Sequence, residues 1–422
     1  MEKQVLDFGN PLANWAIHQR QSAPLPHLSI KREETYLANL LPSLCYSTSP
    51  QVSLCSKFFR LYVSKSRQPF LCSTWTPDGH RLLTGAMSGE FTLFNGINLN
   101  FEMLMQAHED SVRCMAYNHS GEWLISGDQA GTLKVWQPNF NNVHIDKSGH
   151  AECIREVAFS PNDAKFATCS DDGLVKVWGF TTMTEESSLK GHNWDVKCCD
   201  WHPTLSLLAS GSKDNLVKLW DPRMQKCLGT LRDAKNTVSK TKFQPTALQN
   251  LLAVGSRDNS IRIYDLRMGR ALLTLRGNDS DVSALTWHPT HPDLVTAGTQ
   301  DGVISHYLLA QATGDQMLPT LRIPKAHAWP IWDLAYHPMG HVLCSASSDK
   351  SVRLWSRARP NDPTAFHDRF YMDTGAEDSV SELERYRQRE REREMAKESS
   401  SVIPGLRYVE QEGAPADVSR LS

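Results

Sequence analysis

The sequence predicts an all-β fold in which seven four-stranded units close radially into a propeller. Three observations lead to this prediction. Aromatic residues close a recurring unit at intervals of 42 to 48 residues. Within each unit, short apolar runs alternate with turn residues, which is typical of strands. The same polar residues also return at the same place in each unit. The closing positions are Phe94, Trp136, Trp178, Trp220, Tyr264, Tyr307 and Trp355.

The internal pattern of one unit is clearest in residues 191–222, GHNWDVKCCDWHPTLSLLASGSKDNLVKLWDP. Apolar runs of four to six residues follow a Gly-His pair, and a Trp-Asp pair closes the unit. This period and punctuation are typical of WD repeats, whose units are four-stranded blades. The seven closing aromatics therefore predict seven blades.

Recurring His, Ser or Thr, Asp and Trp residues are expected to form one hydrogen-bonded set per blade. The His before a strand can bond the Asp of the next tight turn, while the Ser or Thr hydroxyl links the His to the indole N–H. A hydrolytic triad is the functional alternative, but one triad suffices for an enzyme, whereas three periodic copies fit packing. Complete sets are predicted at His150/Thr168/Asp172/Trp178, His192/Ser210/Asp214/Trp220 and His327/Ser345/Asp349/Trp355.

Other blades are expected to lack members of this set. The second keeps His108, Ser126 and Trp136, but Ala130 stands at the expected Asp position. The fifth has Ala234 and Val254, and the sixth has Asn278 and Ala297. Such loss is ordinary in repeat arrays, because neighbouring units share the stabilisation.

Three parts of the chain are predicted: an irregular N-terminal arm at 1–55, the propeller at 56–358, and a charged, partly helical tail at 359–422. The run KFFRLYV at 57–63 is expected to complete the last blade, since closure removes exposed sheet edges. Residues 382–397 are almost wholly charged with alternating signs, which favours a solvated helix over a partner-binding or RNA-contacting arm.

Composition narrows the classes of function. The net charge of −2 and the pI near 6.8 exclude a polycationic nucleic-acid coat, so any RNA contact must come from a local patch. The ten cysteines include no C-x-x-C pair and indicate buried thiols in a reducing compartment. No apolar run has the length of a membrane span, and the N-terminus lacks a signal-peptide pattern. An intracellular protein without membrane contact is expected.

One local patch suggests RNA binding. Residues 51–77 contain no acidic side chain, and the four basic residues in their strand and following loop are Lys57, Arg60, Lys65 and Arg67. Phe101 and Leu104 lie in the last strand of the first blade. Cations for phosphates and a flat ring for unstacked bases are what single-stranded RNA requires. The alternative is that Phe101 is buried and the basic residues are only solvated.

Several runs of this sequence resemble one family. These are WTPDGHRLLTGAMSGEFTLFNG at 75–96, NFEMLMQAHEDSVRCMAY at 100–117, IREVAFSPNDAKFATCSDDG at 154–173, GHNWDVKCCDWHP at 191–203 and WDLAYHPMGHVLCSASSD at 332–349. They are similar to the WD-repeat subunits of the cleavage and polyadenylation specificity factor, the polyadenylation factor subunit 2 family. The resemblance covers about 7–359, and generic WD repeats do not share SGEFTLFNG at 88–96.

The resemblance implies a nuclear, non-catalytic scaffold that joins a large three-propeller subunit and a zinc-finger subunit. In animal members, this propeller and the zinc-finger protein read AAUAAA in pre-mRNA. A paired uracil and adenine stack there on two phenylalanines, one from the propeller and one from a basic N-terminal arm. Carried over by position, the propeller phenylalanine is Phe101, an aliphatic contact is Leu104 and a loop lysine is Lys65.

The second phenylalanine has no counterpart here. In animal members it precedes a segment like LDFGNPLANWAIHQR, which begins at residue 6 in this chain, and MEKQ supplies neither the ring nor the charges. Either the N-terminus is lost from this sequence, or the complex reads its signal more weakly.

Two other classes of function are less well supported. No Gly-rich phosphate loop, paired-carboxylate motif or metal-ligand cluster stands out, so no catalytic residue, cofactor or metal is predicted. A WD-repeat adaptor of another nuclear complex, in chromatin or a ubiquitin ligase, is the alternative binding module. Co-purification with 3′-processing subunits, or with a cullin or histone complex, distinguishes the two.

Overall fold

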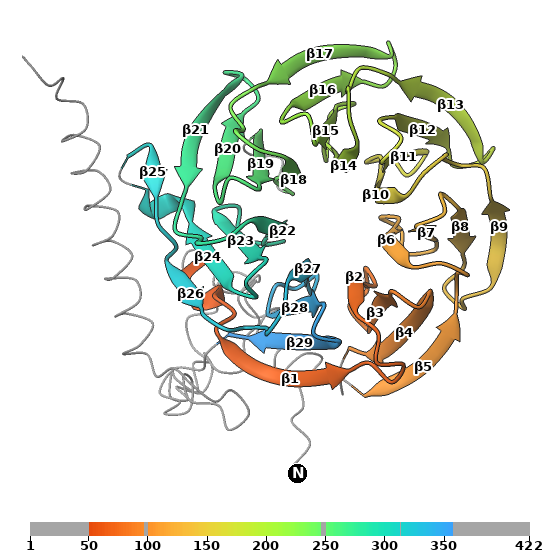
Figure 1. Ribbon diagram of the computed structural model, residues 1–422, viewed down its shortest axis with the longest axis horizontal. Helices are drawn as coiled ribbons and strands as arrows, with labels where there is room; N and C mark the ends of the chain where they lie inside the picture. The colour runs from red at the N-terminus through yellow and green to blue at the C-terminus, as the bar shows by residue number, and fades with distance from the viewer. Residues whose placement is uncertain (1–49, 97–99, 246–249, 313, 358–422) are drawn as a thin grey trace, which may run out of the picture. The chain divides into compact units, whose positions relative to one another are not determined.

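The computed structural model describes residues 50–96, 100–245, 250–312 and 314–357, and these residues form seven β-sheets arranged in a ring (Figure 1). The predicted all-β, seven-bladed propeller is confirmed. The strands run from Lys57 to Ser356. Residues 1–49 and the tail from 358 onwards, including the helix expected at 382–397, lie outside the described residues. The boundaries of the arm and tail therefore stay predictions.

Blades 1 to 5 are each built from four consecutive strands, with the innermost strand first in the chain (Figure 1). Blade 1 has β2 (Phe70–Trp75), β3 (Arg81–Ala86), β4 (Glu90–Asn95) and β5 (Phe101–Gln106); blade 2 has β6 (Val112–Tyr117), β7 (Leu124–Asp128), β8 (Leu133–Trp136) and β9 (Asn142–Asp146); blade 3 has β10 (Ile154–Phe159), β11 (Lys165–Ser170), β12 (Val175–Gly179) and β13 (Thr184–Leu189). Blade 4 has β14 (Val196–Trp201), β15 (Leu208–Ser212), β16 (Val217–Asp221) and β17 (Lys226–Leu231); blade 5 has β18 (Val238–Phe243), β19 (Leu251–Ser256), β20 (Ile261–Asp265) and β21 (Arg270–Leu275).

Blade 6 has an irregular outer edge, which accounts for the longest interval in the repeat. It contains β22 (Val282–Trp287), β23 (Leu294–Thr299), β24 (Ile304–Leu308) and a short outer strand, β26 (Leu321–Ile323). Between β24 and β26 the chain forms the 3-10 helix η3 (Leu309–Gln311) and β25 (Gln316–Met317). Strand β25 pairs in parallel with β21 of blade 5. The extra residues thus tie blade 6 to its neighbour.

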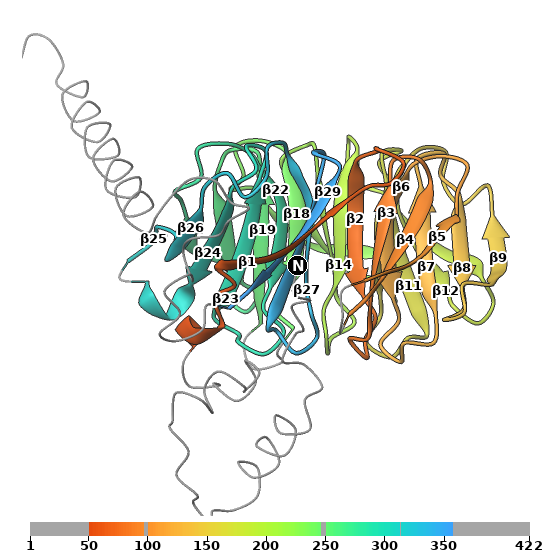
Figure 2. The ribbon, with the colours of Figure 1, turned by 90° about the horizontal axis from the view of Figure 1, so that it is seen from below.

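The N-terminal strand closes the ring, as predicted. After the 3-10 helix η2 (Pro50–Ser53), β1 (Lys57–Val63) pairs antiparallel with β29 (Ser351–Ser356) of blade 7, which also contains β27 (Ile331–Tyr336) and β28 (Val342–Ser347). In Figures 1 and 2, β1, at the red end of the colour scale, lies beside blue β29 on the outer side of the ring. Strand β1 is therefore the fourth strand of blade 7 and covers the edge of β29 that would otherwise stay open.

The hydrophobic core lies between the blades. Each of the seven clusters of buried apolar residues takes side chains from two neighbouring blades. The cluster between blades 7 and 1, for example, joins Phe70 and Leu82 to Val342 and Leu354. Because every blade shares both of its apolar faces, stability is distributed around the ring.

The three predicted hydrogen-bonded sets have the expected contacts. Each His Nδ1 lies 2.8–2.9 Å from an Asp Oδ2, and each His Nε2 lies 2.6–2.7 Å from the Ser or Thr hydroxyl. The indole Nε1 lies 2.7–3.0 Å from the same hydroxyl. A carboxylate only accepts, so Nδ1 donates to it, the hydroxyl donates to Nε2, and the indole donates to the hydroxyl oxygen. Every polar atom of the chain of contacts is used.

The hydroxyl group at the centre of each set is closed off from solvent. The three residues that carry these groups are fully buried, with an exposed fraction of 0%: Thr168, Ser210 and Ser345. A hydrolytic nucleophile has to meet its substrate, so hydroxyls at this depth are not the reactive or ligand-binding groups of an exposed site. Their burial disagrees with the hydrolytic alternative and agrees with a structural role. The bonded pairs are Thr168 with His150 and Trp178, Ser210 with His192 and Trp220, and Ser345 with His327 and Trp355.

The prediction for blade 2 was wrong, because a complete set is present there. His108 Nδ1 lies 2.9 Å from Asp128 Oδ2, and the His108 Nε2 and Trp136 Nε1 atoms lie 2.6 and 2.9 Å from Ser126 Oγ. Asp128 is two residues nearer in sequence than the expected position, Ala130, at the end of β7. The Asp128 carboxylate, at the start of the turn, therefore reaches the imidazole of His108. A carboxylate two residues later, at the expected position, is not needed.

Replacing Asp214 by alanine is expected to lower the free energy of unfolding by about 1–3 kcal/mol, because His192 loses its buried acceptor. Burial acts to raise the pKa of Asp214, but the hydrogen bond and charge of His192, together with the backbone N–H groups of Leu216 and Asn193, hold that pKa below its ordinary value. Denaturant unfolding of the full chain measures the loss. Asp301→Ala is the control, because Asp301 is exposed in blade 6, where Asn278 replaces the histidine. Its expected loss in the free energy of unfolding is about 0.5 kcal/mol or less. Equal stability of the Asp214 variant and the unmodified chain contradicts the assignment.

Candidate nucleic-acid interface

Phe101 and Leu104 lie on the outermost strand of blade 1, and both are exposed, each at 38%. A bulge in the pairing of β4 with β5 explains why residues three apart share a face. Phe101 pairs with Phe94 and Leu104 with Thr92, so Glu102 is the extra residue. The alternative in which Phe101 is an ordinary buried residue is wrong.

Lys65 lies directly over the ring of Phe101, with its Nζ 3.4 Å from the ring centroid. The loop that carries it follows β1 and is held by backbone hydrogen bonds. The Ser64 N–H donates to the Lys350 carbonyl at 2.8 Å, and the Arg67 N–H donates to the Ser64 carbonyl at 3.2 Å. Arg67 has φ of 54° in this turn. The loop therefore places an ammonium group against a π face, a favourable cation–π geometry.

An aromatic row, Tyr62, Phe94 and Phe101, connects blade 7 to blade 1. Tyr62 stacks on Phe94 with ring centroids 4.2 Å apart, and Phe94 meets Phe101 edge to face at 6.4 Å. At the other end of the row, the Arg60 guanidinium lies 5.3 Å from the Tyr62 ring centroid. Tyr62 was not predicted, although its alternation with Arg60 in the strand could have indicated it.

The four predicted basic residues do not form a single cluster. Arg60 Nη2 is 3.4 Å from the Asn100 Oδ1, next to Phe101 in sequence, and Arg67 is exposed in the loop of Lys65. Lys57, however, pairs with Ser356 at the start of β1, about 20 Å of strand from Val63. The structure therefore brings Lys65 and Arg60 to the aromatic row and leaves Lys57 away from it.

One acidic residue next to Phe101 was also missed. Glu102 Oε2 lies 3.2 Å from the Nε of Arg81, and its Oε1 accepts a hydrogen bond of 2.8 Å from Asn95. Arg81 offsets the carboxylate charge, so the positive character at Phe101 persists. The exposed ring, the aliphatic Leu104 side chain and the two cations can together stack a base and neutralise phosphates.

Other chemistry is limited in the part of the chain that the structure describes. Within it, no group of three or more His, Cys, Asp or Glu side chains could hold a metal ion. The thiols of Cys55, Cys72, Cys114, Cys153, Cys169, Cys198, Cys199 and Cys344 are buried and free, as predicted, whereas the free thiol of Cys227 is exposed. No helix among the described residues has the length and apolar character needed to cross a membrane.

Two comparisons with known proteins agree with the fold. The family described as WD domain, G-beta repeat matches residues 100–137, 142–179, 183–221, 225–265, 269–307 and 318–356. Most of blade 1 lies outside these segments, and it is the blade that carries the exposed phenylalanine.

Among curated proteins, the chain is similar to several fungal proteins named Polyadenylation factor subunit 2. It is 46% identical to the protein of Yarrowia lipolytica over 87% of this chain and 77% of the relative. It is 49% identical to that of Schizosaccharomyces pombe over 91% and 79%. The protein of Saccharomyces cerevisiae is 46% identical over 88% and 78%.

Proposed function

We propose a function from one premise: the chain belongs to the polyadenylation factor subunit 2 family. It acts as a non-catalytic scaffold of the mRNA 3′-end cleavage and polyadenylation complex and helps to recognise the polyadenylation signal in pre-mRNA. Its site of action is the nucleus. The alternative, an adaptor of a chromatin or ubiquitin-ligase complex, is not favoured, because the relatives are named polyadenylation factors.

The observation that supports RNA recognition is the contact between Lys65 and the exposed Phe101. Without RNA, the ammonium covers one face of the ring. A base that stacks on Phe101 takes the exposed side or displaces the ammonium, which then meets a phosphate. Leu104 lies on the same face of the strand and gives the base an apolar edge. Arg60 and Arg67 add charge around this surface, and Lys57 contributes only at the far end of β1.

The proposed partners are the large three-propeller subunit and the zinc-finger subunit of the cleavage and polyadenylation specificity factor. Among the described residues, Phe101 is the proposed stacking ring for an AAUAAA-like signal. One ring is a weak platform, because base–aromatic stacking contributes about 1–3 kcal/mol per base. Strong binding is therefore expected only when the zinc-finger subunit adds its own contacts.

Phe101→Ala is expected to weaken binding of an AAUAAA hexamer to the pair with the zinc-finger subunit by about 1–3 kcal/mol, the value of one stacked base. Lys65→Ala is expected to weaken it less and to reduce the slope of log K against log salt by about 0.7. Fluorescence anisotropy with labelled RNA at several salt concentrations measures both effects.

The matched control is Ile145→Ala. Ile145 is exposed on β9 and occupies, in blade 2, the register position that Leu104 has in blade 1. It is expected to leave RNA affinity unchanged. If the pair carrying Phe101→Ala binds the hexamer as tightly as the unmodified pair, Phe101 is not a stacking residue and the proposed role in signal recognition is wrong.

A further inference from the structure

One mouth of the central channel of the ring holds a cavity of about 470 Å³ whose two walls differ in character. Leu71 and Trp332 line one wall, from blades 1 and 7. No Asp or Glu side chain is among the described residues that line the cavity. The opposite wall, from blades 2 to 5, carries the basic residues Arg113, Arg155, Lys197, Lys240 and Arg257.

Register explains why Arg113, Arg155 and Lys197 meet Leu71 and Trp332. Each is the second residue of an innermost strand, and each falls at a break in the pairing with the next strand. A bulge leaves its extra residue unpaired and re-aims the side chain. The side chain of the second residue of each of these strands therefore points at the channel mouth. The type of residue at this position decides the chemistry that each blade contributes. At this position, three neighbouring blades, 2, 3 and 4, carry cationic side chains.

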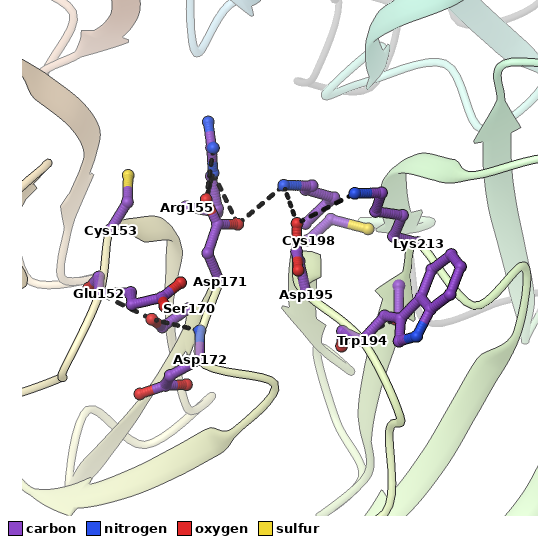
Figure 3. A network of polar contacts seen from close by, with 12 residues as sticks. Glu152, Cys153, Arg155, Ser170, Asp171, Asp172, Trp194, Asp195, Cys198 and Lys213 are labelled. Atoms are coloured by element: carbon purple, nitrogen blue, oxygen red, sulfur yellow. Dashed lines mark hydrogen bonds and ion pairs between the residues drawn. The ribbon is translucent and has the colours of Figure 1, made fainter.

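Carboxylates behind the wall hold two of these three cations in place. Arg155 Nε donates to both oxygens of Asp171 at 2.9 and 2.8 Å. Lys197 Nζ bridges Asp171 at 2.8 Å and Asp195 at 2.9 Å. Figure 3 shows the Arg155 side chain above Asp171, and Lys213 on the far side of Asp195. Since Asp171 and Asp195 offset only two charges, a third cation in this wall leaves it positive.

That third cation is Arg113. Its Nη2 donates to the Gln129 side-chain carbonyl at 2.8 Å, and its buried Nε has no hydrogen-bond partner among the described residues. Burial lowers the pKa of Arg113, and the positive charge of Arg155 adds to this effect. A half-buried guanidinium with an unused Nε donor and a cationic neighbour gains from an added acceptor.

Exposed indoles surround the same mouth. Trp194 is 58% exposed in the loop before β14, and Trp329 is 63% exposed in the loop before β27. Both loops lead directly into strands whose second residues line the cavity. Tryptophan and arginine are enriched in the central residues of protein–protein interfaces.

We propose that the channel mouth binds an acidic peptide segment of a partner protein, whose Asp or Glu carboxylates meet Arg113, Arg155 and Lys197 while apolar neighbours pack against Leu71 and Trp332. The cavity has room for a few side chains, in the usual size range of binding pockets. An RNA strand fits less well, because its phosphates need a cationic track along the whole path. The cations here occupy one wall only.

The test uses the full chain and a panel of fluorescein-labelled peptides of twelve residues. Each peptide carries three glutamates, and the spacing between them is one, two or three residues. The spacer residues are leucine and glycine. Amide versions, with Gln for Glu, are the controls for the peptides. Fluorescence anisotropy is expected to show binding of at least one acidic peptide and none of its amide version. The double variant Arg113→Glu/Lys197→Glu is expected to weaken that binding tenfold or more, since each lost charged hydrogen bond costs about a factor of ten.

Lys226→Glu is the control for the protein, because Lys226 is exposed on the outer strand β17, away from the cavity. Circular dichroism and the melting temperature establish that each variant is folded, and the single changes Arg113→Gln and Lys197→Gln replace the double variant if it unfolds. Three results overturn the proposal: no acidic peptide binds, Lys226→Glu weakens binding as much as the cavity variant does, or the cavity variant loses affinity for a labelled oligouridylate but not for the peptide.

Discussion

Glu156→Ala is expected to lower the free energy of unfolding by about 3–5 kcal/mol, because it removes the carboxylate that pairs with two lysines in the channel. Glu156 Oε1 lies 3.2 Å from the Nζ of Lys240 and 2.7 Å from that of Lys242. Glu156 is 6% exposed, and the side chains of the lysines are 18% and 31% exposed. Despite burial, the charges of the two lysines hold the pKa of Glu156 below its ordinary value.

This network joins blades that are distant in sequence. Glu156 belongs to β10 of blade 3, and both lysines belong to β18 of blade 5, so the ion pairs join two blades that are separated by blade 4. Lys242 also lies 3.7 Å from Asp200 of blade 4. Removal of the central carboxylate thus loosens contacts among three blades at once, whereas loss of one aliphatic contact affects only two.

Two variants separate this effect from the loss of an ordinary ion pair. Glu186→Ala removes an exposed ion pair with Lys165, in which the side chains of Glu186 and Lys165 are 39% and 41% exposed. The expected loss in the free energy of unfolding is less than about 1 kcal/mol. The triple change Glu156→Leu/Lys240→Met/Lys242→Met removes the lysine charges as well and is expected to regain much of the stability. Urea unfolding followed by tryptophan fluorescence measures all three. A loss for Glu156→Ala no larger than that for Glu186→Ala contradicts the assignment.

The repeat pattern was sufficient to predict the blades, because it reports local chemistry that each blade needs for itself. The His, Ser or Thr, Asp and Trp sets depend on contacts between residues at most 22 positions apart. Asp128 escaped prediction because a fixed spacing was assumed, while the carboxylate needs only to reach His108. The closing strand was predicted by the physical need to cover a sheet edge.

The candidate site was predicted less completely, since its geometry depends on contacts between blades. The sequence indicated Phe101 and Lys65, but their contact joins the loop after β1 to strand β5. The bulge at Glu102 has no sequence signature, yet it decides that Leu104 shares a face with Phe101. Lys57 was grouped with the other basic residues by proximity in sequence, whereas an extended strand places it far from them. The ion pair of Glu156 with Lys240 spans 84 residues and could not be predicted from spacing.

A repeated signal outside the predicted sets is the run of an aromatic residue, His and Pro at 201–203, 287–289 and 336–338. The structure shows its purpose in blades 6 and 7. His288 Nε2 donates to the Gly340 carbonyl at 2.8 Å, and His337 Nε2 donates to the Gly79 carbonyl at 3.0 Å. Each histidine thereby joins its blade to the next one around the ring.

These histidines make the propeller sensitive to acid. The Nδ1 of His337 accepts the backbone N–H of Met339 at 3.1 Å, and that of His288 accepts the N–H of His291 at 3.1 Å. A second proton on either ring points at an N–H group, so the folded state resists protonation. Burial lowers the pKa of His288 to about 3 and that of His337 to about 4. It also lowers the pKa of His306, whose Nε2 donates to the Cys55 carbonyl, to about 4.

The direction of the pH effect follows from these values. Above about pH 6.5 the three histidines are neutral in both the folded and the unfolded chain, so their stabilising contribution is fully present. Below that pH the unfolded chain takes up protons that the folded chain refuses, until the pH reaches 3 to 4. The carboxylates of the hydrogen-bonded sets affect stability only at lower pH, since the pKa of Asp349 is about 2. The half-buried Asp200 and Asp333, whose pKa values desolvation raises, act in the opposite direction.

Lowering the pH from 7.5 to 5 is therefore expected to destabilise the propeller by about 2 kcal/mol for each of His288, His306 and His337, or up to about 6 kcal/mol in total. A loss of this size approaches the whole stability of many domains. Urea unfolding at pH 7.5, 6 and 5 measures it. His337→Gln retains a donor for the Gly79 carbonyl without a titrating group, and its loss between these pH values is expected to be smaller by about 2 kcal/mol. A midpoint that stays constant from pH 7.5 to 5, or an equal loss in the His337 variant, shows that these histidines do not carry the acid sensitivity.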